Sequence, residues 1–171
     1  MADITQNLKQ FKSELPEDVT LVAVSKTKPN EDLQEAYDAG QRIFGENKIQ
    51  EMTDKWEALP KDIQWHMIGH VQTNKVKYMA PYVSLIHSAD RLKLFKEINK
   101  EAKKNERVID VLLQVKIAEE DSKFGMPPEE AKIFLEENKA ANYPNVNIVG
   151  LMGMASFVDD ETQIKREFAQ L

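Results

Sequence analysis

The chain has 171 residues, a formal net charge of −6 and no cysteine. This length suits one domain whose core needs no disulfide or zinc staple, and 42% hydrophobic with 30% charged residues is typical of a folded chain. The absence of cysteine excludes thiol catalysis, iron–sulfur clusters and disulfide frameworks. The acidic balance argues against non-specific binding to nucleic acid or to an anionic membrane surface.

Two stretches bear on localisation. The first residues, MADITQNLKQFKSEL, are polar and amphipathic and lack the apolar core of a signal peptide. The longest apolar runs, Leu21–Val24 and Val108–Val115, are far shorter than the ~20 residues that span a bilayer. We therefore expect a cytoplasmic protein with no membrane partner.

Strand-like and helix-like segments alternate along the chain. Short aliphatic and β-branched runs predict buried strands. They are Thr20–Val24, Arg42–Gly45, Ile63–Gly69, Val83–Ser88, Val108–Val115 and Val146–Met152. Helical segments are predicted after them at Glu31–Gly40, Glu46–Leu59, Gln72–Met79, Asp90–Lys104, Pro127–Ala141 and Glu161–Leu171. Asn30, Asp90 and either Asp159 or Asp160 are expected as N-caps, and Gly40 as the residue that ends its helix.

This alternation predicts an α/β fold. Strands that are apolar on both faces and separated by helices favour a parallel sheet with helices outside it. No linker rich in Gly, Pro or Ser divides the chain, so residues 1–171 are expected to form one domain. Both an open doubly wound sheet and a (β/α)₈ barrel fit the pattern, and the spacing alone does not decide between them.

Lys26 is the first candidate for chemistry. Ligands gather at the carboxyl ends of parallel strands, and Lys26 lies two positions past Val24, with Lys28 nearby. Partial desolvation and a neighbouring cation both favour the neutral, nucleophilic amine. Such an amine can form an imine with an aldehyde, the bond that holds pyridoxal phosphate (PLP). An ordinary solvated lysine is the alternative reading.

Two histidines are spaced like metal ligands, but the surrounding pattern does not favour a metal site. His66 and His70 are spaced i, i+4, but the glutamate of an HExxH motif is absent and Gly69 precedes His70 where the strand ends. We expect hydrogen bonding at the rim rather than a metal site. The chain also lacks the glycine fingerprints of nucleotide-binding loops.

Six blocks carry a resemblance to a known family. They are LVAVSKTKP (21–29), FGENKIQE (44–51), WHMIGHVQTNK (65–75), HSADR (87–91), EEDSKFGM (119–126) and GLMGMA (150–155). In this order and at these intervals they closely resemble the pyridoxal phosphate homeostasis protein family, of the YggS or PROSC type. The WHMIGHVQTNK block is the most specific of them.

The resemblance implies a fold, a cofactor and a site. The fold would be the alanine-racemase N-terminal type of (β/α)₈ TIM barrel. Lys26 would hold PLP as an internal aldimine, Asn47 would line the cofactor near its ring, and His66, Ser88 and Met152 would face it from strand ends. Family members are monomers regarded as carriers or regulators of PLP and of amino- and keto-acid pools, without robust racemase activity. No nucleic-acid partner and no metal are implied.

The C-terminal end departs from the family pattern. Relatives continue into two further strand–helix units, where backbone N–H groups gather for the PLP phosphate, whereas this sequence stops within a predicted helix. The expectation is a C-terminally incomplete barrel with weakened phosphate binding. Two alternatives follow: a PLP-dependent amino-acid racemase, for which no strong second base is apparent, and a folded remnant that no longer retains PLP.

Overall fold

The sheet topology decides between the two predicted architectures. The computed structural model describes residues 3–120, 122–137 and 139–171. Six strands form one parallel sheet in the order in which they occur in the chain. They are β1 Ala23–Val24, β2 Ile43–Glu46, β3 Gln64–Met67, β4 Leu85–Ala89, β5 Ile109–Val115 and β6 Val146–Gly153. A doubly wound sheet reverses its strand order at a switch point, and this sheet does not, so the fold is a partial (β/α) TIM barrel, as predicted.

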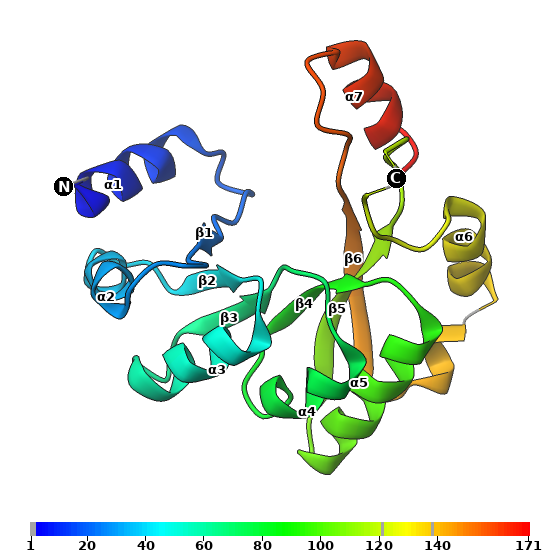
Figure 1. Ribbon diagram of the computed structural model, residues 1–171, viewed down its shortest axis with the longest axis horizontal. Coiled ribbons are helices and arrows are strands. Elements are labelled where there is room, and N and C mark those ends of the chain that lie inside the picture. Colours follow the sequence, from blue (N-terminus) through cyan, green and yellow to red (C-terminus); the bar gives the residue numbers. More distant parts are fainter. Residues whose placement is uncertain (1–2, 121, 138) are drawn as a thin grey trace.

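The helices cover one side of this curved sheet. They are α1 Ile4–Glu14, α2 Asn30–Asp38, α3 Ile49–Ala58, α4 Val76–Met79, α5 Leu92–Lys104, α6 Pro128–Glu136 and α7 Glu161–Phe168, with 3₁₀ turns η1 Thr73–Lys75 and η2 Lys139–Asn142. Figure 1 shows the sheet bending from β1 to β6, with α2 to α6 along its convex side. The concave side is the interior of the barrel, and we call it the inner face.

The two faces differ in composition and cover. On the convex side Trp65, Ile86 and Leu113 are fully buried among helix side chains. On the inner face Val24 and Val149 remain about half exposed (54% and 51%). Apolar burial under the helices therefore supplies the core, and the inner face is open in the part of the chain that the structure describes.

The first strand is shorter than predicted. Only Ala23 and Val24 of the expected Thr20–Val24 strand pair with β2, opposite Phe44 and Gly45. Upstream of this ladder the side-chain amide of Gln41 donates to the carbonyl oxygens of Leu21 (2.9 Å) and Ile43 (2.7 Å). A side chain thus replaces the missing backbone pairing.

Several helix boundaries also differ. Helix α1 was not predicted, although Asp3 caps it by accepting from the N–H of Gln6. The N-cap of α5 is Arg91 and not Asp90. The carboxylate of Asp90 forms an ion pair with Arg91 instead. Asn30 is the first residue of α2 rather than its cap. Helix α6 ends at Glu136, and a separate 3₁₀ turn follows at Lys139–Asn142.

Other boundary predictions are confirmed. Gly40 follows α2 with a φ of +93°, a conformation that glycine adopts without a Cβ penalty. Asp160 caps α7 by accepting from the N–H groups of Thr162 and Gln163. None of the helices in the described residues is long and apolar enough to cross a bilayer.

Candidate functional site

Lys26 lies in a tight turn directly after β1. The N–H of Lys28 donates to the carbonyl oxygen of Ser25 (3.1 Å), which closes the turn around Lys26 and Thr27. The Ser25 side chain is buried toward the helices, whereas the Lys26 side chain is exposed. Within the described residues the Lys26 amine makes no hydrogen bond and no ion pair. It is therefore available to a ligand.

Asn47 occupies the equivalent position after β2. Strand register aligns Val24 with Gly45, so the residues two positions further on, Lys26 and Asn47, end neighbouring strands at the same edge. Gly69 packs directly on the Asn47 backbone, because a Cβ added at Gly69 would lie 2.5 Å from the Asn47 carbonyl oxygen. This close approach fixes where the Asn47 side chain begins.

A pair of histidines lies on the inner face. His66 Nδ1 and His87 Nε2 are 3.0 Å apart, and His66 aligns with Gly45 of β2. Burial, reinforced by the neighbouring His87, lowers the pKa of His66 to about 4, and burial also lowers the pKa of His87. Both rings are neutral at pH 7, so one donates and the other accepts. Consequently one of the two outer nitrogens, His66 Nε2 or His87 Nδ1, carries a hydrogen and the other a lone pair.

The remaining predicted residues lie at neighbouring strand ends. The Ser88 side chain is buried, and its hydroxyl donates to the carbonyl oxygen of Gly69 (2.6 Å), joining the ends of β3 and β4. Met152 on β6 is half-buried and aligns with Gln114 of β5. The structure thus places Lys26 and Asn47 after neighbouring strands at one edge of the sheet and His66 and Met152 within β3 and β6, while the Ser88 hydroxyl is engaged by the backbone.

His70 has other partners than His66. Its ring stacks on Phe124 with centroids 4.1 Å apart, and its Nδ1 lies 3.4 Å from Asp90. No group of three or more His, Asp or Glu side chains in the described chain is arranged to hold a metal ion. Phe124 belongs to the loop after β5, so the stack joins that loop to the end of β3.

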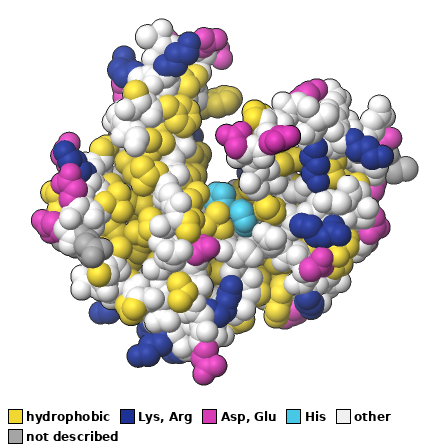
Figure 2. Space-filling view, turned by 180° about the vertical axis from the view of Figure 1, so that it is seen from behind, with side chains coloured by type: hydrophobic (Ala, Val, Ile, Leu, Met, Phe, Trp, Pro, Cys, Tyr) yellow, Lys and Arg dark blue, Asp and Glu magenta, His cyan; other side chains and the backbone are white. Residues whose placement is uncertain are grey.

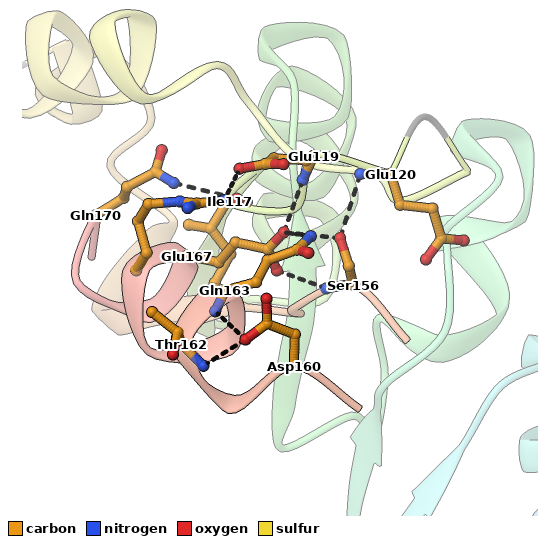
Figure 3. A network of polar contacts seen from close by, with 10 residues as sticks. Ile117, Glu119, Glu120, Ser156, Asp160, Thr162, Gln163, Glu167 and Gln170 are labelled. Carbon is orange, nitrogen blue, oxygen red and sulfur yellow. Dashed lines mark hydrogen bonds and ion pairs between the residues drawn. The ribbon is translucent and has the colours of Figure 1, made fainter. Parts of the chain in front are cut away.

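A polar network holds the loops after β5 and β6 together (Figure 3). The Glu167 carboxylate of α7 accepts from the N–H and hydroxyl of Ser156 and from the N–H of Glu119. With the hydrogen bond from the Gln163 side chain, these bonds lower the pKa of Glu167 to about 2. The network fixes the end of β6, close in sequence to Met152. Sequence reasoning missed it because Ser156 and Glu119 lie 11 and 48 residues from Glu167.

The surface of the molecule is hollowed where histidine side chains lie. Figure 2 shows histidine side chains at the bottom of a depression, with hydrophobic side chains along one flank. A free amine, a carboxamide and a neutral imidazole pair suit a small aromatic aldehyde that carries hydrogen-bonding ring substituents. The residues present therefore fit the PLP ring and its aldehyde. His87 was not among the predicted site residues; the signal was its place in the HSADR block at the end of a predicted strand.

The family model for the alanine racemase N-terminal domain matches residues 1–171. The pyridoxal phosphate homeostasis protein of Escherichia coli K12 is 35% identical, over 98% of this chain and 76% of its own length. The chain belongs to this family. The homologue from Aquifex aeolicus is 42% identical over 88% of this chain, but only 66% of its own length is covered.

A solved member of the family has the same fold. PipY of Synechococcus elongatus without PLP superposes with a TM-score of 0.90 at 35% identity, covering 98% of this chain and 78% of PipY. The PipY structure with PLP bound superposes with a TM-score of 0.85 at 32% identity. The family assignment made from the six sequence blocks is thus confirmed. This chain spans two thirds to four fifths of the length of these relatives.

Proposed function

We propose that residues 1–171 act as one PLP-binding unit that holds and releases the cofactor in PLP homeostasis. The observation that carries this proposal is the exposed, unpartnered Lys26 amine that follows β1 directly, at the same edge of the sheet as Asn47 after β2. When bound, PLP supplies an aldehyde carbon that condenses with a primary amine, a C=N bond forming as water leaves. The solved PipY structure with PLP bound supports the choice of cofactor.

The other residues orient and desolvate the ligand. Asn47 offers both a donor and an acceptor to substituents of the ring. The neutral His66–His87 pair offers hydrogen bonds without adding charge. Ser88 holds the Gly69 carbonyl and thereby the link that packs on Asn47. Met152 supplies an apolar contact from β6, which the network around Glu167 keeps in place.

The proposal is a carrier rather than a racemase. A racemase needs an acid or base on each face of the reacting carbon. Burial lowers the pKa of His66 to about 4, which makes its imidazole a weak base at neutral pH. The Escherichia coli and Aquifex aeolicus relatives are named homeostasis proteins and not racemases, which supports a carrier. The proposal also includes a cytoplasmic monomer that exchanges PLP with small amino or keto acids.

Borohydride trapping tests the assignment. The protein is incubated with PLP, the C=N bond is reduced with borohydride, and peptides are searched by mass spectrometry for a pyridoxyl group. We expect the adduct on Lys26, its loss in Lys26→Ala, and its retention in Lys28→Ala, which removes the same charge two residues away. An adduct spread evenly over the exposed lysines, or one that persists in Lys26→Ala, would refute the proposal.

A further inference from the structure

The turn that carries Lys26 adopts a costly backbone conformation. Thr27 has a φ of +63°, in the left-handed region that β-branched residues rarely occupy. Glycine would adopt this conformation without a Cβ penalty. Strained residues of this kind persist where the surrounding structure over-determines them. The contacts of Ser25 and Thr27, on either side of Lys26, therefore show what holds the turn in this conformation.

Three side chains hold the turn from the helix side of the sheet. Lys55 Nζ donates to the carbonyl oxygen of Ser25 (2.7 Å). The Glu51 carboxylate accepts from the N–H of Thr27 (2.6 Å), and the Glu46 carboxylate accepts from the Ser25 hydroxyl (2.6 Å). We call Glu46, Glu51 and Lys55 the clamp. It binds the chain immediately before and immediately after Lys26.

The charged groups of the clamp pair with one another. Lys55 is 5% exposed, and its ammonium also donates to Glu46 and Glu51, each at 2.8 Å. All three of its hydrogens are therefore used. The hydrogen bond from Lys55, together with that from the Thr27 N–H, lowers the pKa of Glu51. Glu46 is fully buried, and its second carboxylate oxygen has no partner. Such a site tolerates the loss of Lys55 poorly, because a buried charge would lose its counterion.

Packing alone does not account for this arrangement. A buried ion pair contributes little net stability compared with apolar residues of similar volume. Here the ammonium and both carboxylates converge on the backbone and hydroxyl of two residues that flank a reactive lysine. None of these contacts lies on the inner face. The clamp therefore acts on the ligand only through the turn.

We propose that Lys55, together with Glu46 and Glu51, is a positioning residue that forces the Ser25–Lys28 turn into the conformation that directs the Lys26 amine to the inner face. This inference rests on the proposed function, in which Lys26 binds PLP. The clamp offsets the backbone strain at Thr27. If that strain is removed, the turn should keep its conformation without the clamp. This gives a test that a merely stabilising ion pair would not pass.

The test compares Lys55→Met with Lys55→Met/Thr27→Gly. The measured quantity is the rate at which a pyridoxyl adduct accumulates on Lys26 after addition of PLP and borohydride. We expect a loss of about tenfold or more in Lys55→Met, because displacement of a reacting group by about an ångström has effects of this size. The added Thr27→Gly should restore most of the rate, because glycine adopts the turn without the clamp. Lys165→Met, which breaks an exposed ion pair with Glu161, should stay within about twofold of the original chain.

A second readout needs no cofactor. Hydrogen–deuterium exchange at Ser25–Lys28 reports whether the turn is held, and we expect faster exchange in Lys55→Met and in Glu51→Gln but not in Lys165→Met. Glu51→Gln also covers the case in which Lys55→Met does not fold, because Glu51 is partly exposed and the Lys55–Glu46 pair remains. It should still slow the labelling of Lys26.

The outcomes separate the two proposals. Selective labelling of Lys26 in the original chain, with an unchanged rate and unchanged exchange in folded Lys55→Met or Glu51→Gln, overturns the clamp and leaves the PLP site standing. A slowed rate that Thr27→Gly does not restore overturns it too, since the strain would then be irrelevant. Labelling of the original chain with no preference for Lys26 overturns both.

Discussion

Gly69→Ala should damage the site by displacing the backbone that carries Asn47. The added Cβ would lie 2.5 Å from the carbonyl oxygen of Asn47, 2.7 Å from its Cα and 2.9 Å from its carbonyl carbon. Ordinary contacts of this kind are about 3.4 Å or longer, so one backbone must move by roughly 0.5–0.9 Å. All three of these atoms belong to the backbone and none to a flexible side chain. Overpacking of this type costs about 1–3 kcal/mol.

Two measurements check this prediction. Urea denaturation should show a free energy of unfolding lower by about 1–3 kcal/mol. Titration with PLP, followed by the absorbance of the bound cofactor, should show weaker binding because the Asn47 amide is displaced. Gly40→Ala is the matched control: its φ of +93° makes alanine strained there, yet no atom lies within 4 Å of the added Cβ. It should lose similar stability and keep its PLP binding.

Either of two results would contradict this effect of Gly69→Ala. Gly69→Ala could be as stable as the original chain and bind PLP equally well, in which case the close approach has no consequence. Alternatively, Gly40→Ala could lose as much PLP binding as Gly69→Ala, and the effect would then follow global stability rather than the position of Asn47.

Three further predictions concern acid sensitivity and the β3–β4 link. Since the folded pKa of His66 is about 4 against an ordinary 6.5, its contribution to stability is complete above pH 6.5 and is lost as the pH falls toward 4. This contribution is on the order of 3 kcal/mol, at ~1.4 kcal/mol per pKa unit. In His66→Asn, the free energy of unfolding measured by urea denaturation should therefore change less between pH 6.5 and pH 4 than in the original chain. Ionised Glu167 stabilises the fold above pH 4.5, and this stabilisation is lost as the pH falls toward 2. In Glu167→Gln, the free energy of unfolding should therefore depend less on pH between 4.5 and 2, with no change in that dependence at higher pH. Ser88→Ala removes a buried hydrogen bond to Gly69 and should lower the free energy of unfolding by about 1–3 kcal/mol; an unchanged value would contradict this role.

The order of the elements was largely readable from the sequence. Periodicity predicted six strands with a helix after each, and the positions of Lys26 and Asn47 directly after the first two predicted strands placed them at one edge of the sheet. The choice of a barrel came from family resemblance, because spacing does not report the order of strands in a sheet. The length of β1 was mispredicted, because only two of its five expected residues pair with β2 and pairing between strands is not visible in one segment's pattern.

Contacts between elements were not readable in the same way. His66 and His87 are 21 residues apart, and their hydrogen bond depends on the register of β3 against β4. The His70–Phe124 stack depends on how the loop after β5 folds back to the end of β3. A one-residue change of register would turn each side chain to the opposite face. These pairs require coordinates.

Neighbouring residues of the FGENKIQE block have different roles, and their positions in the motif do not reveal which residues contact the ligand and which hold the turn. Asn47 directly follows β2, at the edge of the sheet where the ligand is proposed to lie. Glu46, one residue earlier, points to the helices and accepts from Ser25, and Glu51 reaches the same turn from α3. The pleat of one strand thus separates a residue that would contact the ligand from residues that hold Lys26 from behind. Substitutions in this block should therefore divide by face: Asn47→Ala should weaken PLP binding without altering exchange at the Ser25–Lys28 turn, whereas Glu51→Gln should alter both.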